Sequence, residues 1–449
     1  MLFANYVRRK THGKNTASMD DLGMNRVPSL RALTRIPKVL KNPIPVFNEN
    51  LKEFGDPYCV DMGGGRLGIL TTRPEISQHI LQKNHRAYSK SDIQTKKLAD
   101  FLGKGLLTLE GKEWLRQRRL IQPGFKKERI EGIRGRMIAT VNDALDELES
   151  RIEHDPIVDM HSEMMNLAFR IVAESLLGTK VDAEEINTLR RGVDLSQHIL
   201  IKLIRLPFME WYFNLNGSVR KANRAIESSH QVILQYLEAR RRSGVDNEDL
   251  LQMMLDARYE DTGESMTNRQ LLFELMVMFV AGHETTANAL TWALVLLSKH
   301  TEELQKLRSD QSGYDMNVIN ETLRYYPPAW LTDREALQDD HIAGYRIPKG
   351  SLVISYIYGI HHHPDLWDQP ELFNPARFDQ ETELSGKFLP FGAGPRLCIG
   401  MQFAIMEMQI VLNEFVKRFD FSLLQKEVPM KPLITLNPRG KVGFSLAKR

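Results

Sequence analysis

The segment from Met266 to Lys299 constrains the fold of this chain most, because it predicts one very long helix. Met266, Thr267 and Asn268 offer N-cap residues, and no proline interrupts the strongly apolar sequence from there to Lys299. A helix of about 30 residues is roughly 45 Å long at a rise of about 1.5 Å per residue. Such a helix can cross a whole molecule, so we expect much of the chain to pack around it.

A polar group interrupts this helix, with the sequence Ala-Gly-His-Glu-Thr-Thr at residues 281–286. Glycine weakens a helix by about 1 kcal/mol relative to alanine. A side-chain hydroxyl that bonds to the preceding turn can bend a helix. The segment is therefore either a solvent-facing patch on a bent helix or a functional site, and taken alone it leaves both interpretations open.

Strand signals lie on either side of a long helical middle, which runs from about Asp100 to Tyr325. The predicted strands are Tyr58 to Met62, Leu67 to Thr71, Ile342 to Ile347, Leu352 to Tyr358, Leu433 to Leu436 and Val442 to Leu446. No repeat or linker marks a boundary. We therefore expect a mainly α fold with small β-sheets (α+β), in a single domain of residues 1–449 with a variable segment at 1–50.

Composition narrows the function classes. Hydrophobic residues make up 42% of the 449 residues, enough for a substantial core, and the net charge of +3 argues against a nucleic-acid binder. The cysteines are Cys59, interpreted as a packed strand residue, and Cys398. The apolar stretch within Met1 to Lys10 is far too short for a membrane span, and no secretory signal follows. These features predict a cytoplasmic protein without a membrane anchor.

The most informative short segment is Phe391 to Gly400, where Cys398 lies in a glycine-rich turn before a helix-like run. Glycines allow a sharp turn and close approach to a flat ring. The start of a helix favours the thiolate over the thiol. Arg396 could hold a heme propionate, and Phe391 could pack against the ring. A buried structural cysteine is the alternative.

This segment fills every fixed position of Phe-x-x-Gly-x-Arg-x-Cys-x-Gly and so resembles the heme-binding loop of the cytochrome P-450 family. The resemblance runs from about Gly55 to the C-terminus, with five separate motifs in order. It implies the single-domain, triangular-prism fold of that family. It also implies heme b (iron protoporphyrin IX) with Cys398 as the metal ligand.

The polar interruption of the long helix resembles the family's oxygen-activation motif, Ala/Gly-Gly-x-Asp/Glu-Thr. The resemblance implies that Thr285 and Glu284 are the catalytic residues. Thr285 would present its hydroxyl to the oxygen, and Glu284 would relay protons from bulk water.

Further resemblances imply the residues that hold the heme. Trp114 and Arg118 form the family's Trp-x-x-x-Arg pattern, and at i, i+4 they share one helix face. Arg334 matches the family's basic position after the Pro-rich turn. Together with Phe391 and Arg396, these residues would bind the cofactor.

Two more segments receive a structural interpretation. The resemblance implies that Glu321, Arg324 and Arg377 form a buried ionic triad that supports the cysteine loop. The run His361 to His363 resembles the family's loop before the segment that contains Arg377. We interpret this run as structural.

The implied activity is that of a heme-thiolate monooxygenase, which activates O2 with two electrons from a separate redox partner. No flavin domain or cysteine cluster is visible, so NAD(P)H electrons would arrive through a ferredoxin or flavodoxin and its reductase. A basic stretch could steer such an acidic partner: Lys112, Arg116, Arg119, Lys126 and Lys127. The missing anchor predicts a bacterial enzyme, which we expect to be a monomer.

The substrate is expected to be a small organic molecule that is hydroxylated or oxidatively O-demethylated. Within the class, the alternatives are a methylated sugar such as 6-O-methyl-galactose and a fatty acid or lipid. Outside it, a peroxide-driven peroxygenase, an isomerase or dehydratase, and a heme sensor remain. Glu284 and Thr285 favour the monooxygenase over the peroxygenase and over the isomerase or dehydratase. The lack of a visible partner domain disfavours the sensor.

Overall fold

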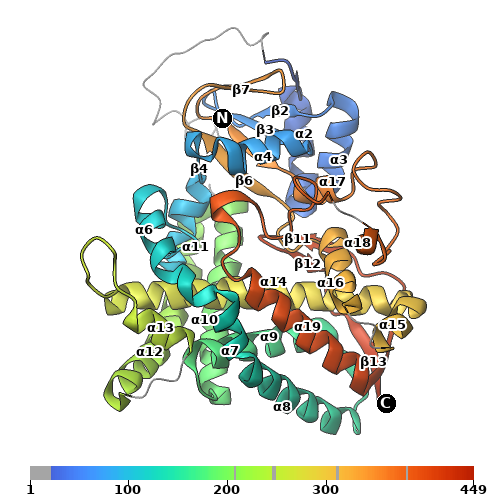
Figure 1. Ribbon diagram of the computed structural model, residues 1–449. Coiled ribbons are helices and arrows are strands. Elements are labelled where there is room, and N and C mark those ends of the chain that lie inside the picture. Colours follow the sequence, from blue (N-terminus) through green and yellow to red (C-terminus); the bar gives the residue numbers. More distant parts are fainter. Residues whose placement is uncertain (1–21, 207–208, 245–248, 310–312, 381–382) are drawn as a thin grey trace. The chain divides into compact units, whose positions relative to one another are not determined.

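The structure, a computed structural model, describes residues 22–206, 209–244, 249–309, 313–380 and 383–449 (Figure 1). The segment Met1 to Lys10, on which the anchor prediction depends, lies outside these ranges. Contacts divide the chain into two compact units. Unit 1 holds the described residues of Met1–Asp92, Ala329–Leu372 and Glu381–Cys398, and unit 2 those of Ile93–Pro328, Phe373–Gln380 and Ile399–Arg449.

Unit 1 is built on a six-stranded sheet in the order β1-β2-β3-β9-β6-β4. Its strands are β1 (Asn25–Arg26), β2 (Tyr58–Asp61), β3 (Leu67–Thr71), β4 (Tyr88–Ser89), β6 (Thr332–Ala336) and β9 (Leu352–Ser355), and a separate hairpin joins β7 (Asp340–Ile342) and β8 (Tyr345–Ile347). Its helices are α2 (Ser29–Lys41), α3 (Pro43–Phe54), α4 (Pro74–Gln78) and α17 (Ile357–His361). Ile69, Val353 and Cys59 are fully buried in its core, as the interpretation of Cys59 requires.

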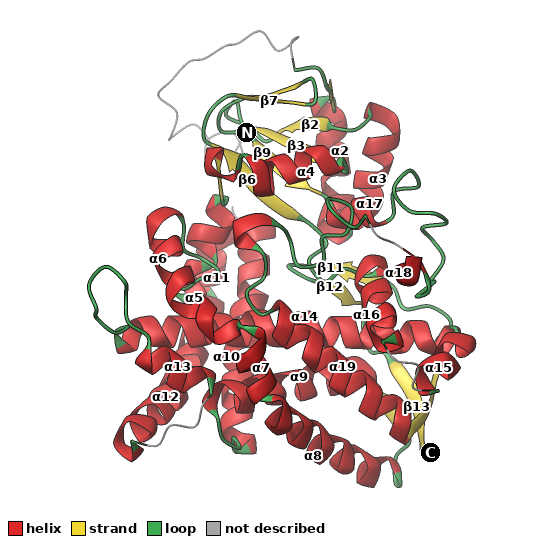
Figure 2. Cartoon of the chain, in the orientation of Figure 1, coloured by secondary structure: helices red, strands yellow, loops and turns green. Residues whose placement is uncertain are grey.

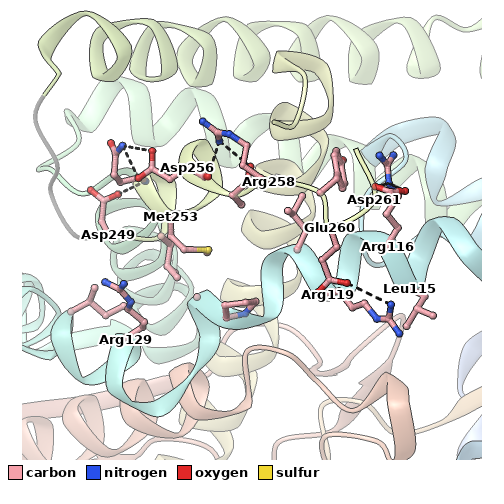
Figure 3. Close-up of a pocket in the computed structure, with 18 of the residues that line it drawn as sticks. Leu115, Arg116, Arg119, Arg129, Asp249, Met253, Asp256, Arg258, Glu260 and Asp261 are labelled. Carbon is pink, nitrogen blue, oxygen red and sulfur yellow. Dashed lines mark hydrogen bonds and ion pairs between the residues drawn. The ribbon is translucent and has the colours of Figure 1, made fainter. Parts of the chain in front are cut away.

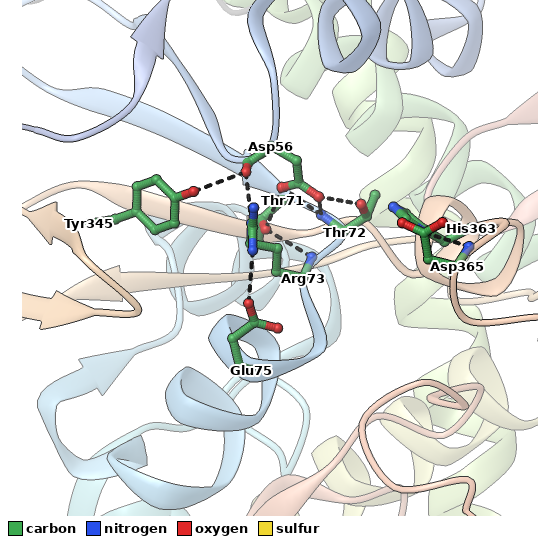
Figure 4. Close-up of polar contacts among 8 residues, drawn as sticks. All are labelled: Asp56, Thr71, Thr72, Arg73, Glu75, Tyr345, His363 and Asp365. Carbon is green, nitrogen blue, oxygen red and sulfur yellow. Dashed lines mark hydrogen bonds and ion pairs between the residues drawn. The ribbon is translucent and has the colours of Figure 1, made fainter.

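The carboxylate of Asp56 anchors the end of β3 within unit 1 (Figure 4). Its oxygens accept hydrogen bonds from the Thr71 hydroxyl at 2.7 Å and from the Thr72 N–H at 3.1 Å. The Asp56 carbonyl accepts from Arg73 Nε at 2.7 Å and from the Tyr345 hydroxyl at 3.3 Å. These bonds satisfy backbone groups at a strand end, where no neighbouring strand continues the ladder.

Unit 2 is mainly helical (Figure 2). Its helices are α5 (Ala99–Leu102), α6 (Gly111–Ile121), α7 (Lys127–Gly132), α8 (Arg134–Ile152), α9 (Met160–Leu177), α10 (Ala183–Arg205), α11 (Glu210–Leu215), α12 (Ser218–Ser243), α13 (Leu250–Asp256), α14 (Asn268–Lys299), α15 (Thr301–Arg308), α16 (Tyr314–Tyr325), α18 (Arg377–Gln380) and α19 (Met401–Arg418). Its strands form two small sheets, β10-β13-β5 and β11-β12, from β5 (Ile157–Asp159), β10 (Phe419–Leu423), β11 (Met430–Pro432), β12 (Leu436–Pro438) and β13 (Gly443–Lys448).

The predicted long helix is α14, which begins after the N-cap residue Thr267 and ends at Lys299. The Thr267 hydroxyl accepts a hydrogen bond from the N–H of Gln270 at 3.2 Å. Helices α9, α16 and α19 pack against α14, and most of its side chains are buried. The prediction of the helix and of its start is confirmed.

The strand predictions had mixed outcomes. The hairpin of β2 and β3 is confirmed, with Tyr58 opposite Leu70. The single strand predicted from Ile342 to Ile347 is wrong, because Ala343 and Gly344 take positive φ angles of 51° and 86° and turn the chain back into β8. The strand predicted from Leu352 to Tyr358 ends at Ser355, and α17 follows.

At the C-terminal end, the segment Leu433 to Leu436 is mostly a turn and not a strand. The N–H of Leu433 and the carbonyl of Thr435 form a tight bond of 2.9 Å between β11 and β12. The last prediction, Val442 to Leu446, corresponds to β13 and is confirmed. None of the helices in the described ranges has the length and apolar character that crossing a membrane requires.

Candidate functional site

Cys398 closes a tight loop at the end of unit 1. Its N–H donates to the carbonyl of Phe391 at 3.0 Å, and its side chain is exposed and forms no disulfide. Gly394 has a φ of 71°, and a Cβ there would lie 2.0 Å from the carbonyl oxygen of Leu81. Only glycine fits at this position, so the loop holds the thiol at the surface by a conformation that other residues cannot adopt.

The other predicted site residues of unit 1 lie on two elements. Phe391 and Arg396 belong to the cysteine loop and are partly buried. Arg334 lies on β6 with a buried side chain, whose Nη1 donates to the carbonyl of Asp333 at 2.6 Å and to the Thr332 hydroxyl at 3.3 Å. The guanidinium is therefore held close to its own strand.

In unit 2, one face of α14 is left uncovered. Between Glu274 and Leu297, the positions that are not buried are Met278, Ala281, Gly282 and Thr285. Their spacing of i, i+3, i+4 and i+7 places them on a single helix face. A helix buried on all other sides thus presents a narrow stripe of small or flexible side chains, with one hydroxyl at its end.

Thr285 and Glu284, the predicted catalytic pair, do not touch each other. The Thr285 hydroxyl donates to the carbonyl of Ala281 at 2.9 Å. Glu284 is buried, and its Oε1 accepts from Thr435 and Asn437 on the β11–β12 hairpin. No hydrogen bond between the two side chains occurs in the part of unit 2 that is described, so the acid and the alcohol point to different partners.

Gly282 has a packing role as well. A Cβ at this position would lie 3.1 Å from a methyl group of Val172 on α9. The next residue, His283, is fully buried, and its Nδ1 lies 2.6 Å from the carbonyl of Phe279. Burial lowers the pKa of His283, so the ring is neutral and belongs to the core.

Trp114 and Arg118 share one face of α6, as predicted from their spacing. Trp114 is buried in a cluster with Leu106 and Leu109, and Ile399 packs against this cluster. Arg118 is partly buried, and its Nε donates to Gln122 at 3.3 Å. The indole is thus fixed by packing, on a helix that also carries the guanidinium.

The predicted ionic triad is confirmed as a set of contacts. Arg324 donates from Nε and Nη2 to the two oxygens of Glu321, at 2.7 and 2.9 Å. Arg377 Nε lies 3.2 Å from Glu321, and the N–H of Asn374 donates to the same carboxylate at 2.9 Å. Glu321 and Arg324 are fully buried. Removing one member of such a buried pair costs roughly 3–5 kcal/mol.

The histidine run has the structural role expected of it. His361 is fully buried, and its Nε2 accepts a hydrogen bond from the N–H of Leu389 at 2.8 Å. Its ring also stacks on Phe388, with centroids 5.4 Å apart. The imidazole therefore supports the chain just before the cysteine loop.

Sequence reasoning missed Glu407, a fully buried carboxyl group on α19. In the described part of the chain neither of its oxygens has a hydrogen-bonding partner. Burial raises the pKa of Glu407 well above its ordinary value and so favours the neutral acid over the carboxylate. A signal existed, because a lone acid interrupts the apolar run from Phe403 to Val411.

The reasoning also missed the partners of Glu284, which are Thr435 and Asn437. Asn288 lies at i+4 from Glu284 on α14, but its side chain donates to the Thr435 hydroxyl, at 3.1 Å. Thr435 and Asn437 are 151 and 153 residues away, and no local pattern links them to Glu284.

The basic stretch proposed for partner docking is exposed, but two of its members are paired. Arg116 lies 3.0 Å from Asp261 and stacks over the ring of Tyr259, and Arg119 lies 3.7 Å from Glu260. These contacts line a pocket of about 540 Å³ beside α6 and α13 (Figure 3). In the described ranges, no ion pair involves the three lysines of the stretch: Lys112, Lys126 and Lys127.

Taken separately, the residues of each unit have the chemistry that a flat cofactor bound through a thiolate would need. Cys398 offers an exposed sulfur in a loop held by Gly394, and α14 offers an uncovered face of small residues ending in Thr285. Cys398, Phe391, Arg396 and Arg334 belong to unit 1, and Trp114, Arg118, Glu284 and Thr285 to unit 2.

Comparison with known proteins gives one consistent family. Residues 25–444 match the family described as Cytochrome P450. Cytokinin hydroxylase of Arabidopsis thaliana is 30% identical to this chain, and the match covers 88% of the chain and 81% of the relative. Cyclooctat-9-en-7-ol 5-monooxygenase of Streptomyces melanosporofaciens is 29% identical (83% and 84% covered). Taurochenodeoxycholic 6 alpha-hydroxylase of Sus scrofa is 26% identical (86% and 82% covered).

Proposed function

The chain belongs to the cytochrome P450 family and is a heme-thiolate monooxygenase, and on that premise we propose that it hydroxylates a largely apolar small molecule. The family implies heme, O2 and electrons from a redox partner. The overall reaction is balanced as RH + O2 + 2 e⁻ + 2 H⁺ → ROH + H2O.

We propose that Cys398 is the residue that would bind the heme iron, through its thiolate. The support is its exposed position in the loop, the strict glycine requirement at Gly394 and the match of the chain to the family. Trp114, Arg118, Arg334 and Arg396 are proposed to hold the propionates, and Phe391 to pack against the ring. That both units form one heme domain also remains a prediction.

When bound, the heme supplies the iron at which O2 is reduced, and a thiolate ligand favours O–O cleavage. The protein contributes the protons. The Thr285 hydroxyl lies on the face of α14 that is not buried, where it can exchange its bond to the Ala281 carbonyl for one to a group held there. The Glu284 carboxyl group, one residue away and buried, would relay protons to that hydroxyl through water, since the two side chains do not touch.

The observation that carries the substrate proposal is the stripe on α14. Its members other than Thr285 are Met278, Ala281 and Gly282, whose side chains offer a sugar hydroxyl no more than the weak thioether acceptor of Met278. A site that selects polyhydroxy compounds needs such groups, because unpaired buried hydroxyls are costly. Two of the relatives, a monooxygenase of a cyclic alcohol and a hydroxylase of a bile acid, are consistent with a compact apolar substrate.

The test is a panel of four compounds added to the purified heme protein: dodecanoic acid, a cyclic terpene alcohol, a bile acid and methyl 6-O-methyl-galactoside. We expect one or more of the first three to shift the heme absorption band and to give a hydroxylated product with ferredoxin, its reductase and NADPH. A shift and formaldehyde release with the galactoside alone would overturn the proposal in favour of O-demethylation. Full turnover with hydrogen peroxide and no reductase would favour a peroxygenase.

We also propose a ferredoxin or flavodoxin as the electron donor, with Lys112, Lys126 and Lys127 as the first contacts. These lysines are exposed and without ion pairs in the described ranges, so they can attract an acidic surface.

A further inference from the structure

The second carboxyl oxygen of Glu284 is the starting point of this inference, which rests on the proposed proton-relay role of Glu284. Oε1 accepts hydrogen bonds from the Thr435 hydroxyl at 2.5 Å and from Asn437 Nδ2 at 3.0 Å. Among the described residues, the hydrogen bonds to Glu284 reach Oε1 and none reaches Oε2. The two oxygens of one carboxylate are therefore in different environments.

The donors to Oε1 are themselves oriented. The oxygen of the Thr435 hydroxyl accepts from Asn288 Nδ2 at 3.1 Å and from Asn437 Nδ2 at 2.8 Å. A hydroxyl has one proton and two lone pairs. Asn437 Nδ2 also lies 3.2 Å from the Thr435 carbonyl, so its two protons serve three acceptors. The lone pair that Asn288 occupies and the 2.5 Å distance to Glu284 Oε1 orient the hydroxyl proton toward that oxygen.

The orientation extends one step further, to α9. The carbonyl oxygen of the Asn288 side chain lies 3.0 Å from Nε2 of His161, and Asn288 is fully buried. Burial lowers the pKa of His161, so a neutral ring with a proton on Nε2 donates to Asn288. Every donor in the series His161, Asn288, Thr435 thus points toward Glu284.

Such a series holds a carboxylate in one rotamer. Hydrogen bonds to a charged group are stronger than those between neutral groups, and buried networks of this kind are rigid when every member is satisfied. The network leaves only Oε2 free to exchange a proton. We propose that Thr435 and Asn437 are positioning residues that bind Glu284 Oε1 and so make Oε2 the oxygen that takes up and releases protons for the monooxygenase reaction.

The first test is infrared spectroscopy of the full-length heme protein, without turnover. The carboxylate band of Glu284 is identified as the band that Glu284→Gln removes. We expect Thr435→Val to shift this band and Thr435→Ser, which keeps the hydroxyl, to restore it. The matched control is Thr291→Val on α14, because the buried Thr291 hydroxyl donates only to the carbonyl of Ala287, at 2.7 Å.

The second test is a double-mutant cycle on the thermal midpoint of unfolding. If Thr435 acts on Glu284, Thr435→Val should lower the thermal midpoint less in the Glu284→Gln background than in the wild type. We expect the decrease to be at most about half as large. An unshifted band in Thr435→Val, additive losses in the cycle, or no rescue by serine would each overturn the proposal. Should Thr435→Val fail to fold, Asn437→Leu tests the same oxygen.

Neither measurement needs a substrate or an electron donor. A wrong substrate class would leave both results unchanged, and the loss of the proposed function would be seen separately in the carbon-monoxide spectrum of Cys398→Ala. The two proposals can therefore fail independently.

Discussion

At the scale of single residues, Cys398 and Thr285 differ in how much of the structure depends on them. The Cys398 thiol has no disulfide and is exposed, while its backbone N–H closes the loop onto Phe391. Among the described residues, the Thr285 hydroxyl bonds to the carbonyl of Ala281, within its own helix. Replacing the Thr285 side chain should therefore have little effect on folding, and replacing Cys398 leaves the backbone bond that closes its loop.

Replacing Cys398 by alanine tests the proposed ligand. We expect the ferrous carbon-monoxide complex to lose the absorption band that a thiolate ligand produces, because no other sulfur replaces it. Cys59→Ala is the matched control, since Cys59 is fully buried in the unit 1 core, and its complex should keep that band. A thiolate band that persists in Cys398→Ala would remove this residue as the ligand.

Replacing Thr285 by alanine tests the proposed proton donor. We expect heme and substrate binding to persist and stability to change by less than about 0.5 kcal/mol. A larger share of the NADPH electrons should appear as hydrogen peroxide, because protons no longer reach the oxygen in time. Thr286→Ala is the control: its hydroxyl makes the same bond to the preceding turn, with Gly282, but it is buried. If Thr285→Ala and Thr286→Ala send the same share of NADPH electrons to hydrogen peroxide, Thr285 does not have the proposed role.

At the scale of elements, α14 combines a covered core face with one open stripe. Near the start of α14, a buried carboxyl group also fixes the helix by hydrogen bonds. Glu274 is fully buried, its Oε2 accepts from the N–H of Leu106 at 2.9 Å and its Oε1 from Gln270 at 2.8 Å. The bond from Leu106 thereby connects α14 to the loop that precedes α6.

This carboxyl group predicts a pH dependence of stability. Burial raises the pKa of Glu274 from its ordinary 4.5 to about 7, although the hydrogen bonds from Leu106 and Gln270 oppose the shift. The folded state then holds the proton more tightly than the unfolded state. The free energy of unfolding therefore falls as pH rises between these two values, by up to about 3 kcal/mol from this group.

The Glu274→Gln variant should remove this contribution, because glutamine does not titrate but can still accept from Leu106. We expect urea unfolding to give a flatter dependence on pH and higher stability than the wild type at pH 8 (about 3 kcal/mol at most). Glu264→Gln, an exposed position before α14, should behave like the wild type. Parallel pH curves for Glu274→Gln and the wild type would show that Glu274 titrates normally.

At the scale of the whole molecule, the net charge of +3 does not show which basic side chains are paired with acidic ones. This local pairing bears on the supply of electrons. Arg116 and Arg119 are paired with Asp261 and Glu260 from the loop between α13 and α14. This acidic loop occupies positions that an acidic partner could otherwise contact. The exposed lysines are left as the available cations of the basic stretch.

Charge changes on this surface should alter the reduction rate in opposite directions. We expect Lys126→Glu with Lys127→Glu to slow reduction by a ferredoxin roughly tenfold at low salt, and less at high salt. Asp261→Asn with Glu260→Gln should speed it, because the arginines lose their pairs. Stopped-flow measurements with the same ferredoxin give both rates. If the lysine variant keeps the wild-type rate at low salt, the partner docks elsewhere.

The sequence by itself determined what depends on neighbours along the chain. The helix α14 with its N-cap Thr267, the β2–β3 hairpin and the contact of Glu321 with Arg324 follow from local spacing and turn chemistry. The family motifs also pointed to the candidate site residues, because each lies within a short segment.

Only the tertiary structure decided which distant groups meet. It brought Thr435 and Asn437 to Glu284, closed the triad with Arg377 and paired Arg116 with Asp261. It also left Glu407 buried without a partner in the described ranges. Such contacts depend on how helices and hairpins pack, since the free energy of burying and pairing a polar group is set by surroundings that no local pattern contains.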